Sequence, residues 1–150
     1  MKKSNQLPGY CFFCEKTYDK RGISRHLKSC KAREEAIAAE EGKKERLFQI
    51  RVESPYTSDY WLDIEMAAGA TLDELDDILR NVWLECCGHL SQFSINERYY
   101  VSLLDPDSPF GDWRKEDDMD ISLAKTRPMN KKVHYEYDFG STTELTVEVT

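Results

Sequence analysis

Four side chains of the types that bind zinc lie close together in the sequence, with the spacing Cys11-x2-Cys14-x11-His26-x3-Cys30. Two cysteines on a turn and two ligands one helical turn apart can converge on one point, and zinc prefers four nitrogen or sulfur donors in a tetrahedron. The sequence therefore predicts that Cys11, Cys14, His26 and Cys30 bind one Zn²⁺ ion. Because protein atoms fill all four positions, the predicted role of the ion is structural and coupled to folding.

Two apolar residues around these ligands indicate how the segment folds. Tyr18 follows Cys14 by four residues and Ile23 precedes His26 by three. The segment resembles a ββα finger of the Cys₂-His₂ type, in which an aromatic and an aliphatic residue at these positions form the small core. It differs in having cysteine as the last ligand and one residue fewer between Tyr18 and the helix.

The residues after the first two ligands predict one long helix over 20–42. They are rich in Ala, Glu, Lys and Arg, which favour helices, and Gly42 is a plausible end. Few large apolar residues follow Cys30, so this part is expected to be a solvated spacer that serves as a semi-rigid arm. We therefore predict two parts, a head of residues 1–42 with the zinc finger and its arm, and a body of residues 45–150.

Charge is distributed unevenly along the 150 residues, whose formal net charge is −7. Residues 1–33 contain nine Lys or Arg against two acidic residues, whereas residues 34–150 contain twelve against twenty-six. A basic head could approach a polyanion such as nucleic acid, or it could dock on the acidic body. Charge alone does not choose between these alternatives.

The finger offers few side chains for reading DNA bases. The positions that face bases in such fingers fall on Asp19, Gly22 and Arg25, and one finger covers only about 3 base pairs. Sequence-specific duplex recognition by the head alone is therefore not expected. Phosphate contacts are open to the basic residues Lys16, Lys20, Arg21, Lys28 and Lys31. The prediction is a binding module whose partner is nucleic acid or another protein, with its oligomeric state undetermined.

The body is predicted to be α+β, in the order β-β-α-β-β-loop-β-β. Phe48, Ile50 and Val52 alternate with polar residues as in a strand, and 60–66 predicts a second one. Thr71-Leu72-Asp73-Glu74 forms a capping box before an amphipathic helix with apolar residues Leu72, Leu75, Ile78, Leu79, Val82 and Trp83. Further strands are predicted at 93–95, 99–104, 133–139 and 145–149, with a loop at 105–120.

Two other clusters of reactive side chains favour structural interpretations. Glu85, Cys86, Cys87 and His89 lie at the C-terminus of the predicted helix, where the helix dipole opposes a thiolate, so both cysteines are interpreted as packing residues. A weaker metal site of Cys86, Cys87 and His89 stays open. The acidic loop 105–120 does not fit an EF-hand, because Pro109 occupies the third ligand position, and is interpreted as solvated.

From Leu47 to Val149 the body resembles the plasmid pRiA4b ORF-3-like family. Four ordered pieces carry the resemblance: Phe48 to Val52, Trp61 ten residues before Thr71-Leu72, His89-Leu90-x2-Phe93, and Tyr137-Asp138-Phe139-Gly140 with Glu144. The family is α+β and has no established reaction to our knowledge.

This chain departs from the family at two places. Ser141, Thr142 and Thr143 replace the usual Asp-x-Trp after Gly140, and Ser91 replaces the second His of His-Leu-His. If those residues form a site in relatives, the site is incomplete here. The alternative to a binding module is an enzyme with a pocket near His89 and Asp138 that uses Cys86 or Cys87 as nucleophile. Relatives often continue past this hairpin, so the resemblance leaves open whether residue 150 is the natural C-terminus.

The sequence predicts a cytoplasmic protein. No apolar run approaches the ~18 residues of a membrane-spanning helix, and a polar stretch follows Met1-Lys2-Lys3 where a secretory signal would have an apolar core. In a reducing compartment, clustered cysteines are better interpreted as metal ligands than as disulfides.

Overall fold

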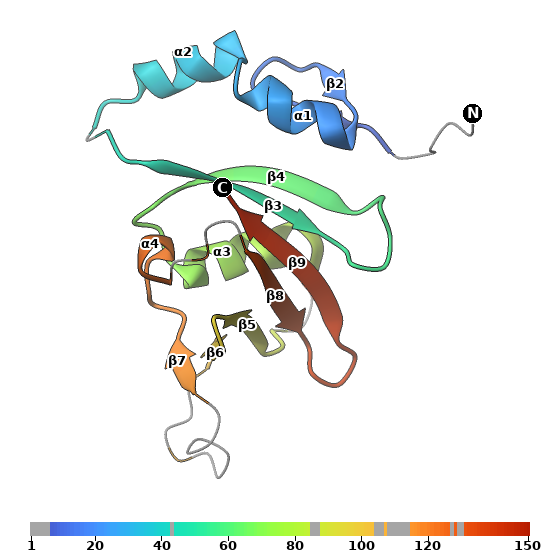
Figure 1. The fold of residues 1–150 in the computed structure, drawn as a ribbon, viewed down its shortest axis with the longest axis vertical. Helices are drawn as coiled ribbons and strands as arrows, with labels where there is room; N and C mark the ends of the chain where they lie inside the picture. The colour runs from blue at the N-terminus through green and yellow to red at the C-terminus, as the bar shows by residue number, and fades with distance from the viewer. Residues whose placement is uncertain are drawn as a thin grey trace.

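The computed structural model describes residues 7–42, 44–84, 88–103, 107, 115–126, 128 and 131–150. Within these residues the fold is α+β, as predicted, with a two-stranded sheet, a seven-stranded sheet and four α-helices (Figure 1). None of the helices in the described part of the chain is long and apolar enough to cross a membrane.

The head contains a short antiparallel hairpin followed by two helices. Strands β1 (Gly9–Tyr10) and β2 (Thr17–Tyr18) pair, and helices α1 (Lys20–Leu27) and α2 (Lys31–Ala39) follow. The ββα order is as the finger resemblance implies. Asp19 begins α1, since its Oδ1 accepts a hydrogen bond from the Gly22 amide at 2.5 Å.

The prediction of one continuous helix over residues 20–42 is wrong. The chain leaves α1 after Leu27, and Cys30 has an extended backbone (φ −75°, ψ 109°) as the N-cap of α2. The break falls at a serine, a poor interior helix residue, and it lets the Cys30 thiol turn toward Cys11. Helix α2 ends at Ala39, before Gly42.

The seven-stranded sheet of the body has the order β4-β3-β9-β8-β5-β6-β7. All neighbouring pairs are antiparallel except β6–β7, which is parallel. The strands are β3 (Leu47–Glu53), β4 (Trp61–Ala67), β5 (Ser91–Ile95), β6 (Arg98–Val101), β7 (Glu116–Asp118), β8 (Lys132–Tyr137) and β9 (Thr143–Val149). The predicted strands are thus present, and β6 is shorter than expected.

Two elements of the body were not predicted. Strand β7 lies inside the expected loop 105–120, where the Tyr99 amide donates to the Lys115 carbonyl at 2.9 Å beside the parallel pairing with β6. Helix α4 (Leu123–Thr126) is held by amide hydrogen bonds from Leu123 to Ala70 and from Ala124 to Ala68. Both elements depend on distant parts of the chain, so no local pattern indicates them.

Helix α3 (Leu72–Leu79) begins at the predicted capping box. The Glu74 amide donates to Thr71 Oγ1 at 3.2 Å, and the Thr71 amide donates to Glu74 Oε2 at 2.7 Å. Arg80–Leu84 continue as a π-helical turn, which is wider than an α-turn and changes the direction in which side chains point. Val82, predicted on the buried face, is therefore 50% exposed.

The main core lies between α3 and one face of the sheet. Phe48, Ile50 and Val52 of β3 point to this face and pack with Leu75 and Leu79 of α3. The predicted alternation of β3 is thus confirmed. The other face of β3 and β4 carries polar residues and Trp61, and in Figure 1 the head covers it while α3 lies on the opposite side.

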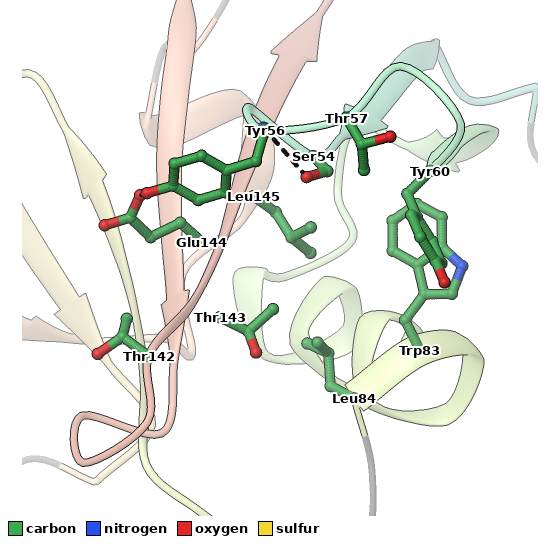
Figure 2. Close-up of a pocket in the computed structure, with 10 residues that line it drawn as sticks. All are labelled: Ser54, Tyr56, Thr57, Tyr60, Trp83, Leu84, Thr142, Thr143, Glu144 and Leu145. Carbon is green, nitrogen blue, oxygen red and sulfur yellow. Dashed lines mark hydrogen bonds between the residues drawn. The ribbon is translucent and has the colours of Figure 1, made fainter. Parts of the chain in front are cut away.

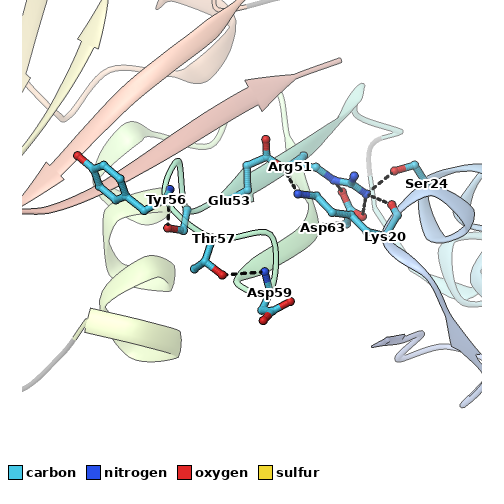
Figure 3. A network of polar contacts seen from close by, with 9 residues as sticks. Lys20, Ser24, Arg51, Glu53, Tyr56, Thr57, Asp59 and Asp63 are labelled. Atoms are coloured by element: carbon cyan, nitrogen blue, oxygen red, sulfur yellow. Dashed lines mark hydrogen bonds and ion pairs between the residues drawn. The ribbon is translucent and has the colours of Figure 1, made fainter. Parts of the chain in front are cut away.

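Arg51 connects the head to this outer face (Figure 3). Its guanidinium donates to both carboxylate oxygens of its cross-strand partner Asp63, at 2.9 and 2.6 Å. Arg51 Nη2, which makes the shorter of these two bonds, also donates to the Lys20 carbonyl and to Ser24 Oγ, both at 2.8 Å. Burial opposes the charge of Arg51, but the hydrogen bond and attraction of Asp63 outweigh it and raise its pKa.

Two further ion pairs and one aromatic contact extend this interface. Lys20 Nζ lies 2.6 Å from Glu53, and Arg33 Nη2 lies 2.6 Å from Glu65. Trp61 packs against the small core of the head, and a Cβ atom at Gly9 would collide with its ring. The head therefore docks on the acidic body, which was one of the two alternatives that charge left open.

A buried polar network joins α3 to the sheet. Asp76 is 3% exposed and accepts hydrogen bonds from Ser91 Oγ at 2.7 Å, Tyr135 Oη at 2.6 Å and Arg80 Nε at 2.6 Å. Arg80 Nη2 also donates to Ser91 Oγ at 2.8 Å. Burial and the Asp76 carboxylate raise the pKa of Tyr135, so its hydroxyl stays protonated as a donor. The network is internally satisfied, which favours a structural role.

We predict that Asp76→Ala lowers the free energy of unfolding by about 3 kcal/mol or more, because it leaves the Arg80 charge and two hydroxyls without their buried acceptor. Chemical denaturation measures this. The control is Asp77→Ala, which removes an exposed carboxylate from the same helix and should change stability by about 0.5 kcal/mol or less. Equal effects of the two substitutions would contradict the role assigned to Asp76.

Candidate functional site

The four predicted ligands lie together in the head. One ligand atom from each of Cys11, Cys14, His26 and Cys30 can be chosen so that all lie within 4.8 Å of one another. Metal–ligand lengths of about 2.3 Å for sulfur and 2.0 Å for nitrogen place tetrahedral ligand atoms roughly 3.5–3.8 Å apart. The cluster has this scale, and the four residues are close enough to bind a metal ion.

Each ligand is positioned by local backbone structure. The Cys11 amide donates to the Lys16 carbonyl at 2.9 Å, and the Glu15 amide donates to the Cys11 carbonyl at 2.9 Å, so the first two cysteines lie on one tight turn. Glu15 has φ 60°, the left-handed conformation that closes the turn. His26 and Cys30 flank the end of α1, with Cys30 outside the helix instead of on its face as the spacing had predicted.

The histidine ring is oriented by the predicted core aromatic. Tyr18 stacks on His26 with ring centroids 3.9 Å apart, and His26 Nε2 lies 3.2 Å from Cys14 Sγ. Ile23 is buried beside Cys11 and Cys30. The core positions proposed from the sequence therefore pack around the ligand cluster.

The pKa values of the first two thiols are shifted in opposite directions. Burial raises the pKa of Cys11. Burial also acts to raise the pKa of Cys14, but hydrogen bonds from the Lys16 backbone, Cys11 and Cys30 outweigh it and lower that pKa. Close thiols beside an imidazole are the donor set of a soft or borderline metal, and they leave no carboxylate or water position for a hard cation. The residues present thus fit a closed tetrahedral site.

Two surfaces of the head stay exposed after it docks on the body. Arg21 and Arg25 of α1 and Lys28 at its C-cap are exposed at intervals of four and three residues, so they form one basic stripe. Among the described residues they form no ion pair. On the ligand turn, Phe12 is 85% exposed and contacts Phe13 edge to face, with centroids 6.0 Å apart. We call Phe12 and Phe13 the aromatic turn.

The second predicted cluster is only partly described. Glu85, Cys86 and Cys87 lie outside the described residues, as do Pro109 and much of the acidic loop. His89 is in the described part, and its Nδ1 lies 3.8 Å from Asp138 Oδ1. Ser91, noted as a departure from the family, belongs to the Asp76 network.

A pocket of about 440 Å³ lies on the body, and neither His89 nor Asp138 of the enzyme alternative is among its described lining residues (Figure 2). Its walls come from the β3–β4 connection, the π-helical turn and the start of β9. Its described lining residues include the aromatic residues Tyr56, Tyr60 and Trp83 and one carboxylate, Glu144. No motif in the sequence indicated this site, because three segments far apart in sequence form it. The clustered tyrosines before β4 were the available signal.

Comparison with known proteins concerns mainly the body. The structure is similar to the crystal structure of the protein of unknown function MM3350 from Methanosarcina mazei Go1, with a TM-score of 0.57 and 16% sequence identity. The match covers 72% of this chain and 61% of that chain, so this chain spans less than two-thirds of its structural relative. At this identity the likeness shows the fold alone. No curated protein matches the chain.

A match to a family sequence profile is more informative about family membership. The profile of the plasmid pRiA4b ORF-3-like proteins matches residues 46–150, which agrees with the resemblance inferred from Leu47 to Val149. The head lies outside this match. Since the match covers most of the 150 residues, the chain belongs to the plasmid pRiA4b ORF-3-like protein family.

Proposed function

We propose that the chain is a non-enzymatic binding module whose head is built around one structural Zn²⁺ ion. The observation that carries this proposal is the convergence of Cys11, Cys14, His26 and Cys30 within 4.8 Å. All four are protein ligands, so zinc in this site would have no open position for substrate or catalytic water. Its thiols would remain available in a reducing cytoplasm, which is the compartment we propose.

The proposed partner is nucleic acid, contacted through its phosphates. The basic stripe of Arg21, Arg25 and Lys28 supports this, because docking engages other cations of the head and leaves these three exposed. Lys20, one of the phosphate contacts considered from the sequence, is paired with Glu53. Asp19 caps α1 and Gly22 has no side chain, so neither is expected to read a base. The proposed binding therefore depends on the charge of the nucleic-acid phosphates and not on the base sequence.

The aromatic turn supports a second candidate, a protein partner. Phe12 and Phe13 expose apolar surface on the turn between Cys11 and Cys14, and exposed aromatic residues are common anchors of protein interfaces. The two candidates differ in their expected salt dependence, since phosphate contacts release counterions and apolar contacts do not.

We predict one zinc ion per full-length chain by elemental analysis, and its loss in Cys14→Ala, since three remaining ligands hold a structural ion poorly. Ser29→Ala, an exposed change next to Cys30, is the control and should retain the ion. Absence of zinc from the wild type after growth in zinc-containing medium would contradict the proposal. A second ion surviving Cys14→Ala would revive the site of Cys86, Cys87 and His89.

We predict that the full-length chain binds labelled random DNA and RNA oligonucleotides with an affinity that falls as salt rises, measured by fluorescence anisotropy. Replacing Arg21, Arg25 and Lys28 by Ala should reduce the steepness of log K against log salt by about 2 to 3 for duplex DNA, because each lost contact contributes about 0.9.

The control replaces Lys44, Lys125 and Lys132, exposed cations outside the stripe, and removes the same charge. Equal losses in the two triple variants would show that net charge, not the stripe, causes binding. Absence of binding at low salt would contradict the nucleic-acid partner and favour a protein partner at the aromatic turn.

A further inference from the structure

The body pocket of about 440 Å³ has a lining that the proposed function does not use. Its volume lies within the range of about 300–1,000 Å³ that holds small ligands. Its described lining residues all belong to the body, so the pocket is separate from the ligand cluster and the basic stripe of the head. The pocket could therefore bind a ligand of its own.

Three aromatic side chains line this pocket without being fully buried in the core. Tyr56 is 77% exposed and Tyr60 is 60% exposed, while Trp83 is partly buried at the edge of the main core. Figure 2 shows Tyr60 and Trp83 at one side of the pocket and Tyr56 with Glu144 at another, with Leu84 and Leu145 between them. Large aromatic residues exposed together at a concave site are typical of ligand recognition.

The charge of the lining residues indicates the sign of the charge that a ligand would have. Among the described lining residues, Glu144 alone has a full charge at neutral pH, and the other polar side-chain groups are hydroxyls and the indole N–H of Trp83. Tyr56 Oη donates a hydrogen bond to Glu144 Oε2, and this bond raises the pKa of Tyr56, so the tyrosine remains neutral beside a negative carboxylate. A cation is therefore favoured and an anion is repelled.

The small number of carboxylate ligands indicates which kind of cation the pocket could bind. A Mg²⁺ or Ca²⁺ ion needs six or more oxygen ligands, usually with several carboxylates, and the described lining of this pocket provides one carboxylate. An ammonium nitrogen covered by alkyl groups makes few hydrogen bonds, and aromatic faces attract it through their negative π surfaces. Aromatic rings around one carboxylate match that chemistry.

We propose that the pocket formed by Tyr56, Tyr60, Trp83 and Glu144 binds an alkylammonium group. The group could belong to a free quaternary amine or to an N-methylated lysine side chain of a peptide, since both present the same cation to the aromatic rings. The hydroxyls of Ser54, Thr57 and Thr143 would contact the polar remainder of the ligand.

Binding is tested by nuclear magnetic resonance titration of the ¹⁵N-labelled full-length chain with choline and, in a second arm, with a peptide containing trimethyl-lysine. Saturable shifts of the Trp83 indole N–H and of neighbouring amides are expected in at least one arm. The uncharged isostere of choline, with carbon in place of nitrogen, should bind about tenfold more weakly or not at all, because it lacks the attraction to the rings and to Glu144.

Two variants locate the site. Tyr60→Ala and Glu144→Gln should each weaken binding about three- to tenfold, whereas Tyr10→Ala, which removes a tyrosine of similar exposure (61%) from the head, should leave it unchanged. Retention of dispersed amide spectra shows that each variant is folded. Equal binding of the isostere, absence of saturable shifts in both arms, or unchanged binding in Tyr60→Ala would each overturn the proposal.

Discussion

One face of the β3–β4 hairpin packs in the core beneath α3, and the other face contacts the head. The arrangement of head and body depends on this division. Residues at alternate positions of β3 point into the core beneath α3, while their neighbours Arg51 and Glu53 point outward to the head. Arg51 is central because one guanidinium binds Asp63 across the strands and two groups of α1. A shift of one residue in the register of this hairpin would bury those charges and expose the apolar side.

The head by itself has little with which to stabilise a fold. Its core consists of a few side chains around the ligand cluster, and segments of about 40 residues usually need a metal, disulfides or a partner surface. Here the cluster supplies a site for a metal, and Trp61 of β4 adds a large aromatic surface from the body. Gly9 permits this contact, since any side chain there would meet the Trp61 ring. We therefore regard metal binding and docking as contributions to one structure.

Local patterns in the sequence predicted much of the fold. The alternation of Phe48, Ile50 and Val52 and the capping box at Thr71 each depend on neighbouring residues, and both are present. The ligand spacing likewise predicted the cluster of Cys11, Cys14, His26 and Cys30. The division into residues 1–42 and 45–150 stays a prediction, and so does the identity of the metal.

What local patterns could not predict depends on contacts between distant segments. The α1–α2 break follows from the direction in which Cys30 must turn, and β7 and α4 depend on pairing with β6 and the β4–α3 connection. Asp76 offered one signal that was not used, a charged residue on the apolar face of α3 four residues before Arg80. Trp61 was noted for its spacing in the family, but its contact with the head was visible only in the folded chain.

Hydrogen–deuterium exchange with and without a zinc chelator tests most directly whether the metal and the docked interface form one structure. Removal of the metal should increase exchange in residues 9–39, and also in Trp61–Ala67 of β4, because this edge strand loses the head that covers its outer face. Protection of Lys132–Tyr137 and Thr143–Val149 should be retained, since no described residue of the head belongs to the core beneath α3. Increased exchange confined to residues 9–39, or full protection of the head after metal removal, would contradict this account.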